Sequence, residues 1–291
     1  MGKVWELDFY SRPILDENKK KQWEVLICET QTDSQGSLED GFRYAKFCPP
    51  STVNSIWLRE AIETAIEKAG EAPSKIRFFR RQMNNMIVKA CEDAGLVATP
   101  SRRTYTLNNW LDERFQDFYP SQEGYNETAA AANASVAYPP LNAIALPDAV
   151  RGDKSDKWAF VSLEASAFAD MSEWDIKFGE GFPLELANIP RDAKIPGFII
   201  FSQRALPLAG WMSGLELVSL KFQPKPLPIL SLETGLSDSW ILASLTDKSS
   251  VVEAQGFDNT KNNAQGVHFL AIQSSPDVEV FSGFWLLKDD H

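Results

Sequence analysis

The stretch WELDFYSRP, residues 5–13, opens the chain and decides how its N-terminal half folds. Read with a period of two, Trp5, Leu7 and Phe9 share one face, whereas the intervening Glu6, Asp8 and Tyr10 share the other. This alternation predicts a strand over residues 4–12 with one buried face and one polar face. Arg12-Pro13 should end the strand, because proline donates no hydrogen bond to a neighbouring strand and restricts the residue before it.

The elements that follow this strand predict an α/β domain. A second strand is expected at 22–30, a third at 41–48 and a fourth at 74–80. Helices are expected from Ser51 or Thr52 to Ala69, and again at 84–94. Three strands, a helix, a strand and a helix form the element order of the ribonuclease H-like fold. We therefore predict the α/β class, with helices packed on mixed sheets and an N-terminal domain that is ribonuclease H-like in element order.

The length and composition of the chain predict two domains, 1–120 and 121–291. The segment 119–141 contains an alanine run and Pro139-Pro140, which is typical of a linker. The segment 196–235 echoes the segment 74–107, since both read as strand, arginine turn, helix and apolar strand. This echo suggests that the two domains are diverged duplicates of one fold.

Charge is distributed unevenly along the chain. The net charge is −11, yet residues 1–120 hold 17 Lys and Arg against 18 Asp and Glu, whereas the remaining residues hold 12 against 22. Within residues 75–103, seven basic side chains stand against two acidic ones. An acidic C-terminal domain beside a locally basic N-terminal domain is compatible with RNA binding, because local patches act on a ligand as well as the total charge does.

Several classes of protein are excluded or disfavoured. The sequence has no run of about 18 apolar residues, so no membrane span is expected. It begins without an apolar signal region or an Arg- and Ser-rich transit peptide, and we therefore expect a bacterial, cytoplasmic protein. Cys28, Cys48 and Cys91 lack CxxC spacing and are interpreted as reduced thiols. With only His268 and His291 available, we expect neither a histidine-based metal site nor a histidine-dependent catalytic triad, and we interpret His268 as a hydrogen-bonded sheet residue.

The carboxylates do not form a convincing nuclease pattern. A ribonuclease H-type site needs several carboxylates around two metal ions. Asp8 stands on the first strand, and Glu60 or Glu63 could supply a helix carboxylate, but the fourth strand carries arginines in place of an acid. A cation there opposes metal binding. Since the motifs of phosphate-binding loops, dinucleotide folds, zinc proteases and serine hydrolases are also missing, we expect a protein that is not an enzyme.

The segment 75–103 is the best candidate for a binding surface, because it interleaves basic with aromatic side chains. Cations neutralise RNA phosphates, aromatic rings stack on unpaired bases, and the amides of Gln82, Asn84 and Asn85 could contact base edges. The alternative is that the phenylalanines are buried in their strand and the cations are simply solvated. The candidate RNA-binding residues are Arg12, Lys75, Arg77, Phe79, Arg80, Arg81, Lys89, Arg102 and Arg103.

Four separated motifs carry a resemblance to a known family. They are WELDFYSRP at 5–13, WEVLIC at 23–28, FFRRQM at 78–83 and FWLL at 284–287. In this order they resemble the Tab-type family, which comprises chloroplast RNA-binding proteins that activate translation of a photosystem I message, together with cyanobacterial relatives. The residues that carry the family motif are Trp5, Asp8, Tyr10, Trp285, Leu286 and Leu287.

The resemblance implies a non-catalytic protein without a cofactor that binds single-stranded RNA, the 5′ leader of a photosystem message, and regulates the translation or biogenesis of photosystem subunits. It also places Arg12, Arg80 and Arg81 inside matching motifs. An alternative is a protein–protein assembly factor for photosystem biogenesis, which would bind its partner through the acidic half and the apolar C-terminal strand around Trp285. A metal-dependent nuclease is the third reading.

Overall fold

The computed structural model describes residues 2–34, 36, 41–131, 141–152 and 156–289. The chain divides into two compact units: unit 1 comprises residues 1–30 and 38–139, and unit 2 comprises residues 31–37 and 140–291. Of the predicted linker 119–141, residues 132–140 lie outside the described residues, whereas the preceding part contains a helical turn at Tyr119–Ser121 and a short helix at Glu127–Ala131. The division of the sequence at residue 120 stays a prediction.

Unit 1 is built on a five-stranded sheet with the strand order β3-β2-β1-β4-β5. Strand β2 runs antiparallel to β1 and β3, whereas β4 runs parallel to β1 and β5. The strands are β1 (Val4–Leu15), β2 (Lys21–Glu29), β3 (Arg43–Cys48), β4 (Lys75–Phe78) and β5 (Ala98–Pro100). The helices are α1 (Ser55–Ala69), α2 (Asn84–Asp93), α3 (Tyr105–Glu113) and α4 (Glu127–Ala131). The predicted element order is confirmed, while the likeness to the ribonuclease H-like fold stays a prediction.

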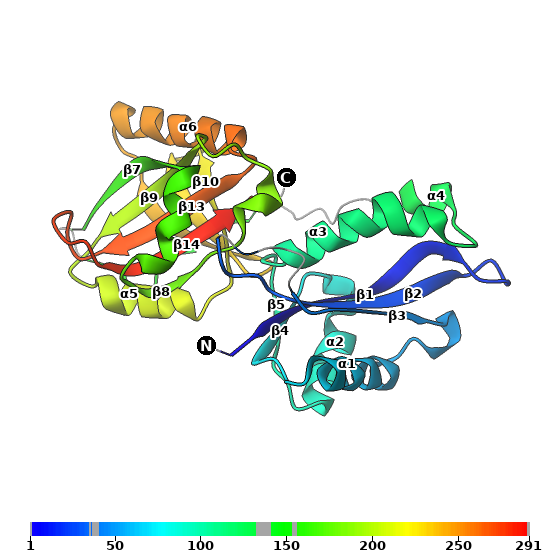
Figure 1. The fold of residues 1–291 in the computed structure, drawn as a ribbon. Helices are drawn as coiled ribbons and strands as arrows, with labels where there is room; N and C mark the ends of the chain where they lie inside the picture. Colours follow the sequence, from blue (N-terminus) through cyan, green and yellow to red (C-terminus); the bar gives the residue numbers. More distant parts are fainter. Residues whose placement is uncertain (1, 35, 37–40, 132–140, 153–155, 290–291) are drawn as a thin grey trace. The chain divides into compact units, whose positions relative to one another are not determined.

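Helices cover both faces of this sheet (Figure 1). On the face toward α1 and α2, the side chains of Trp5, Leu7 and Phe9 are fully buried and belong to one apolar cluster with helix residues such as Leu58 and Ile62. The predicted apolar face of β1 is therefore confirmed. The opposite face, predicted to be polar, is also buried, because α3 and the helical turns η3 (Arg114–Phe118) and η4 (Tyr119–Ser121) cover it.

The end of β1 and the start of α1 differ from the sequence prediction. Strand β1 continues to Leu15, because a register shift between Ser11 and Leu15 accommodates the proline without ending the pairing with β2. Helix α1 is capped by Asn54 and not by Ser51 or Thr52, since the Asn54 Oδ1 atom accepts a hydrogen bond of 2.9 Å from the backbone N–H of Trp57. The chain between β3 and this cap forms a short 3₁₀ turn, η1 (Pro50–Thr52).

Unit 2 contains two sheets, of five strands in the order β7-β9-β13-β14-β8 and of four in the order β10-β11-β12-β6. The five-stranded sheet consists of β7 (Lys157–Glu164), β8 (Ile176–Glu180), β9 (Lys194–Phe201), β13 (Val267–Gln273) and β14 (Phe281–Lys288). The four-stranded sheet consists of β6 (Ile144–Ala145), β10 (Leu217–Gln223), β11 (Ile229–Thr234) and β12 (Asp238–Ser244). The helical segments are α5 (Ala205–Ser213), α6 (Lys248–Asn263), η5 (Ala165–Glu173) and η6 (Leu184–Ala187).

The C-terminal motif lies in the core of unit 2. Trp285 and Leu287 of β14 belong to an apolar cluster with residues of α5, α6 and the four-stranded sheet. On the other face of β14, the ring of Phe284 packs against that of Phe168 from η5. Leu286 is fully buried as well, and Trp285 keeps only 4% of its surface exposed. These side chains stabilise unit 2 and are not available to a partner protein.

The predicted duplication is contradicted by the topology. Strands β4 and β5 pair in parallel within one sheet, on either side of α2. The corresponding strands β9 and β10 flank α5 but lie in different sheets. The echo between the two sequence segments reflects a shared local order of strand, turn and helix, and this local order does not fix how the strands pair.

Two further sequence predictions concern thiols and membranes. Cys28, Cys48 and Cys91 are buried as free thiols in unit 1, as expected of reduced cysteines. Burial raises the pKa of Cys91 to about 12, which keeps this thiol protonated. Over the described part of the chain, no helix combines the length and the apolar character that a bilayer span requires.

His268 links the two sheets of unit 2. Its fully buried ring accepts a hydrogen bond of 2.8 Å from the Leu220 N–H at Nε2, so that Nδ1 donates to the Gly266 carbonyl at 2.8 Å. Burial, and then the charge of Lys261, lower the pKa of His268 to about 3. The ring is therefore neutral, and its interpretation as a hydrogen-bonded sheet residue is confirmed.

We expect unit 2 to lose stability in mild acid because of this histidine. The folded-state pKa of His268 lies below the unfolded value of about 6.5, so its stabilisation is fully present above pH 6.5 and is lost as the pH falls toward 3. Between pH 7 and pH 5 the wild type should lose about 2 kcal/mol more of its free energy of unfolding than the His268→Gln variant loses. Urea denaturation at each pH measures the difference, and equal losses in both proteins would contradict it.

Candidate nucleic-acid interface

The candidate interface lies beside the middle of β1, where β4 ends and the chain turns toward α2. Since β1 and β4 pair in parallel over residues 4–6 and 75–77, the chain that leaves the carboxyl edge of β4 at Phe79-Arg80-Arg81 passes beside Asp8 of β1. The turn η2 (Arg81–Met83) then leads into α2. Strand pairing thus brings together two of the motifs that carry the family resemblance, WELDFYSRP and FFRRQM, although 72 residues separate Asp8 from Arg80.

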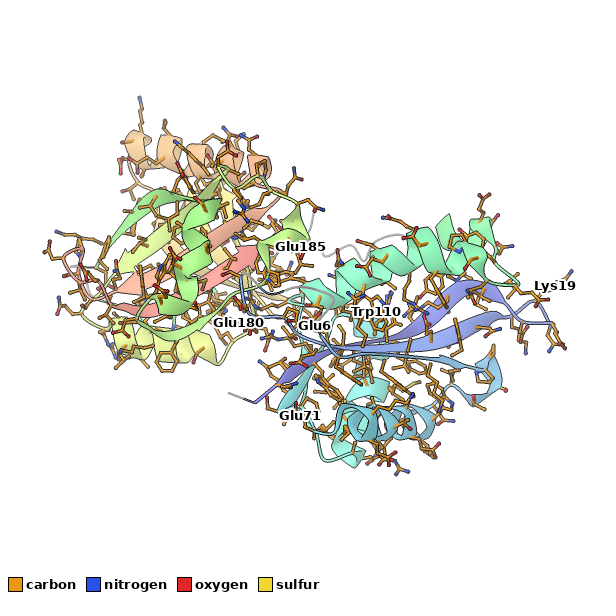
Figure 2. The ribbon with its side chains drawn as sticks, in the orientation of Figure 1. Glu6, Lys19, Glu71, Trp110, Glu180 and Glu185 are labelled. Atoms are coloured by element: carbon orange, nitrogen blue, oxygen red, sulfur yellow. The ribbon has the colours of Figure 1, made fainter. Side chains whose placement is uncertain are left out.

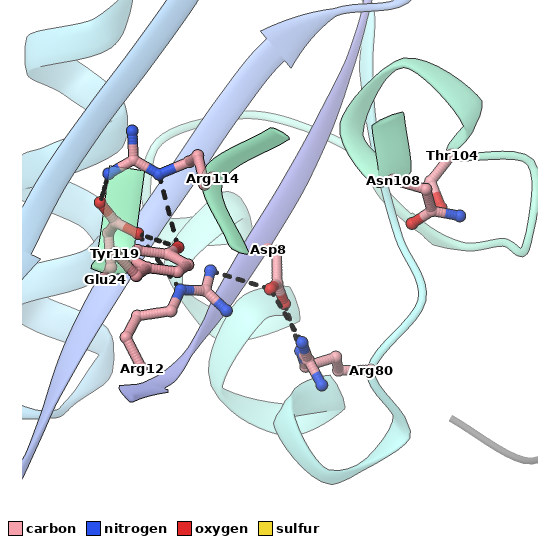
Figure 3. Close-up of polar contacts among 8 residues, drawn as sticks. All are labelled: Asp8, Arg12, Glu24, Arg80, Thr104, Asn108, Arg114 and Tyr119. Carbon is pink, nitrogen blue, oxygen red and sulfur yellow. Dashed lines mark hydrogen bonds and ion pairs between the residues drawn. The ribbon is translucent and has the colours of Figure 1, made fainter. Parts of the chain in front are cut away.

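Asp8 holds this edge together through two arginines (Figure 3). Its Oδ1 atom accepts a hydrogen bond from Arg80 Nε at 2.5 Å, and its Oδ2 atom accepts hydrogen bonds from Arg80 Nη2 at 3.1 Å and from Arg12 Nη2 at 2.9 Å. The side chains of Asp8 and Arg12 have no exposed surface, and that of Arg80 is 10% exposed. Both carboxylate oxygens are therefore engaged by guanidinium groups.

The ion pairs continue from Arg12 to a second carboxylate. Arg12 Nε donates to Glu24 Oε2 at 3.2 Å, and the Tyr119 hydroxyl donates to the same oxygen at 2.6 Å. Arg114 Nη2 donates to the other oxygen of Glu24. We call these six residues the buried ionic layer; its members are Asp8, Arg12, Glu24, Arg80, Arg114 and Tyr119. It joins β1 and β2 to the start of α2 and to the helical turns after α3.

The electrostatics keep the layer charged. Burial raises the pKa of Asp8, but the charges of Arg80 and Arg12 together outweigh it and hold the pKa below its usual value. Burial likewise raises the pKa of Tyr119, so its hydroxyl stays protonated and donates to Glu24. An ionised carboxylate whose two oxygens already accept hydrogen bonds from arginines is poorly placed to coordinate a metal ion. In the part of the chain that the structure describes, no group of three or more His, Cys, Asp or Glu residues could hold a metal.

A further carboxylate on the same face of β1, that of Glu6, binds the start of helix α3. The Glu6 Oε2 atom accepts a hydrogen bond of 2.7 Å from the backbone N–H of Leu107, at the start of α3. Figure 2 labels Glu6 on β1 and Trp110 on α3, which lies over this face of the sheet. A carboxylate bound to a free N–H in the first turn of a helix is favoured by the helix dipole. This contact fixes α3 over the charged face of β1.

The predicted RNA-binding residues fall into two groups. Arg12, Arg77 and Arg103 are almost fully buried, and so are Phe79 and Arg80, at 8% exposure each. As surface contacts for RNA these five assignments are contradicted by their burial, because α3 and the following turns cover the face of β1 and β4 that carries most of them. The accessible group consists of Arg81 and Lys89, which are exposed, and of Lys75 and Arg102, which are partly exposed.

The family motif residues are mostly structural. Trp5 is fully buried, with its ring stacked on that of Phe42 at a centroid distance of 5.1 Å. Asp8 belongs to the buried ionic layer. Tyr10 is partly exposed, and the guanidinium carbon of Arg80 lies 4.0 Å from the centroid of its ring. Of the N-terminal motif residues, Tyr10 alone combines partial exposure with a position beside the candidate interface.

Three members of the buried ionic layer, Glu24, Arg114 and Tyr119, were not predicted from the sequence to lie in a buried site. Glu24 follows the period of two in the second strand and lies on the same face as Asp8, so the alternation could have revealed it. Arg114 and Tyr119 follow the apolar residues Trp110 and Leu111 of α3, and this apolar pattern was the available signal for a helix packed on the sheet.

The chain matches known proteins over nearly its full length. A family model described as "RNA-binding protein Tab2/Atab2 N terminal" matches residues 4–114, and its "C-terminal domain" counterpart matches residues 133–288. A protein of Arabidopsis thaliana described as "Protein TAB2 homolog, chloroplastic" is 38% identical over 295 residues, covering 99% of this chain and 75% of the relative. The similarly described protein of Zea mays is 36% identical over 292 residues, covering 98% and 71%. No solved structure matches the chain.

These relatives correct one prediction. Both plant proteins are described as chloroplastic, which contradicts the predicted cytoplasmic localisation. That prediction rested only on the composition of the first residues of the sequence, and these residues do not decide the compartment.

We expect the Asp8→Asn variant to lose about 3–5 kcal/mol of its free energy of unfolding, because it leaves two buried arginines without their counter-charge. The matched control is Asp93→Asn, which removes an exposed ion pair to Lys89 and should change the free energy by no more than about 0.5 kcal/mol. Urea denaturation measures both values. Similar values for the two variants would show that the ion pairs of Asp8 do not hold unit 1 together.

Proposed function

Because the chain belongs to the Tab2/Atab2 family of RNA-binding proteins, we propose that it binds single-stranded RNA and regulates the translation or biogenesis of photosystem subunits. The observation that carries this function is the pair of family models, which together match residues 4–114 and 133–288. The proposed RNA is the 5′ leader of a photosystem message. The proposed contact surface is in unit 1, around the start of α2, which directly follows Arg80 and Arg81.

The start of α2 supports RNA binding through its exposed side chains. Arg81, Gln82 and Asn85 are exposed, and Lys89 follows one helical turn after Asn85. A guanidinium binds phosphate, and side-chain amides form hydrogen bonds with the edges of unpaired bases. Arg80, directly before this group, is fixed by Asp8 and so holds the backbone that presents Arg81. We therefore assign Arg81 to phosphate binding and Arg80 to positioning.

We propose that the protein does not cleave the RNA. The description of the family as RNA-binding supports this reading, as does the chemistry of Asp8, whose oxygens both accept hydrogen bonds from arginines. A metal-dependent nuclease would need this carboxylate to be open to a metal ion. The alternative of a protein-binding assembly factor loses its specific support, because Trp285, the residue proposed to contact the partner, is buried in the core of unit 2.

The proposed function is tested with the purified full-length chain and a labelled single-stranded 5′ leader RNA, over a salt series and with duplex DNA as competitor. We expect tight, salt-dependent binding without cleavage, because counterions leave the RNA when cations of the protein contact its phosphates. Failure to bind at low salt, where phosphate attraction is strongest, would contradict the function. Cleavage that requires a divalent metal ion and is abolished in Asp8→Asn would instead support the interpretation as a metal-dependent nuclease.

Arg81→Gln tests the assigned phosphate contact. Removing one contact should make the slope of log affinity against log salt shallower by about 0.7, the value for single-stranded nucleic acid, and should weaken binding at low salt. The control is Lys248→Gln, which removes the same charge from an exposed position at the start of α6 in unit 2 and should leave the slope unchanged. A slope that is the same for Arg81→Gln, Lys248→Gln and the wild type would exclude Arg81 from the interface.

A further inference from the structure

A row of aromatic rings lies at the end of the sheet where β1 passes the start of β2. The ring of Trp23 lies 5.6 Å from that of Tyr10 and 5.4 Å from that of Phe9 between centroids. The ring of Phe9 in turn stacks on that of Trp57, at 5.5 Å and an interplanar angle of 13°. We call Tyr10, Trp23, Phe9 and Trp57 the aromatic row. Phe9 is fully buried, whereas the other three rings are partly exposed.

The row is built by strand pairing and by the cap of α1. Trp23 opposes Ser11 of β1 on one side and Cys48, the last residue of β3, on the other, so it lies between these two strands. Phe9 and Tyr10 point to opposite faces of β1, and Trp23 contacts both. The hydrogen bond from the Trp57 N–H to Asn54 fixes the first turn of α1. The rings are therefore held in place before any ligand arrives.

A cation lies at each end of this row. At one end the Arg80 guanidinium carbon is 4.0 Å from the centroid of the Tyr10 ring, and at the other end Lys46 Nζ is 5.2 Å from the centroid of a Trp57 ring. Arg80 is held by Asp8, whereas Lys46 is exposed. Partly exposed rings between cations suit a ligand that is flat, aromatic and negatively charged. A nucleotide has both features, a base that stacks and a phosphate that carries charge.

We propose that the aromatic row is a stacking site for unpaired RNA bases, with Lys46 contacting the backbone phosphates. This inference rests on the proposed RNA binding and assigns its base-contacting part to Tyr10, Trp23 and Trp57. The rings lie near the start of α2, because Arg80 contacts Tyr10 with its face and directly precedes Arg81 in the chain. One RNA segment can thus place its bases on the rings and a phosphate at Arg81. Rigid aromatic rings lose little conformational entropy on binding.

The wild-type protein provides the first test, which needs no substitution. Its affinity is measured for an adenine-rich single-stranded RNA and for an RNA of the same length in which abasic sites replace most bases. Both RNAs carry the same phosphates, so we expect the abasic RNA to bind about 10-fold more weakly if bases stack on the row. Equal, salt-dependent affinities would overturn the stacking site and leave the RNA-binding function standing. Failure of both RNAs to bind at low salt would overturn the function, and the site with it.

Trp57→Leu locates the site, with Trp158→Leu as control. Trp158 is a partly exposed tryptophan of unit 2 with its own aromatic neighbour, Phe160. We expect Trp57→Leu to lose most of the 10-fold preference for RNA with bases while keeping its salt slope, and Trp158→Leu to keep both. If Trp57→Leu keeps the preference for RNA with bases, the assignment of the aromatic row to base stacking is overturned, and a protein becomes the better candidate for its partner.

Thermal unfolding shows whether Trp57→Leu folds, since its ring packs against the buried Phe9. The exposed position of Lys46 offers a variant that leaves the core intact. Lys46→Glu places a negative charge beside Trp57 and should weaken binding of both RNAs severalfold at low salt. Unchanged affinity of Lys46→Glu for both RNAs would overturn the site even where Trp57→Leu does not fold.

Discussion

The carboxylate of Asp8, held between Arg80 and Arg12, is the interaction on which the rest of unit 1 depends. Removing these charges from water costs several kcal/mol for each ion, so the arrangement is stable only while every charge has its partner. This requirement fixes the position of the chain after β4, because Arg80 must reach Asp8 from there. The start of α2, with the exposed side chains that we assign to RNA, follows directly from that position.

The same layer accounts for a basic edge in a protein with a net charge of −11. Its ion pairs join three guanidinium groups to only two carboxylates, and the hydroxyl of Tyr119 stays neutral because burial raises its pKa. The layer thus holds one guanidinium more than carboxylates, and the side chains of Arg80 and Arg114 each keep 10% exposure. A phosphate approaching Arg80 meets a local positive field, because the excess of acidic over basic residues lies almost entirely in residues 121–291.

The features that could be predicted from the sequence depend on residues that are close together along the chain. Alternation in β1, the end of α1 at Ala69 and the order of strands and helices follow from local periodicity, and the structure has them. The sequence did not predict that the polar face of β1 is buried, because the residues that cover it begin about a hundred positions later, at Tyr105. Arg80 and Arg81 illustrate what the sequence cannot predict. They are adjacent and chemically identical, yet Arg80 is buried and Arg81 is exposed. Only the pairing of β1 with β4 distinguishes them.

Arg80 also explains why folding and the proposed RNA contact cannot be separated in this unit. Its Nε and Nη2 atoms donate hydrogen bonds in the plane of the guanidinium to Asp8, while the face of the same group covers the ring of Tyr10. A lysine could supply the charge but neither the paired donors nor the flat face. The contact that fixes the buried ionic layer therefore also fixes the first ring of the aromatic row. A surface set by the fold in this way requires little rearrangement when a flexible single strand binds, and that strand then bears most of the entropic cost of ordering.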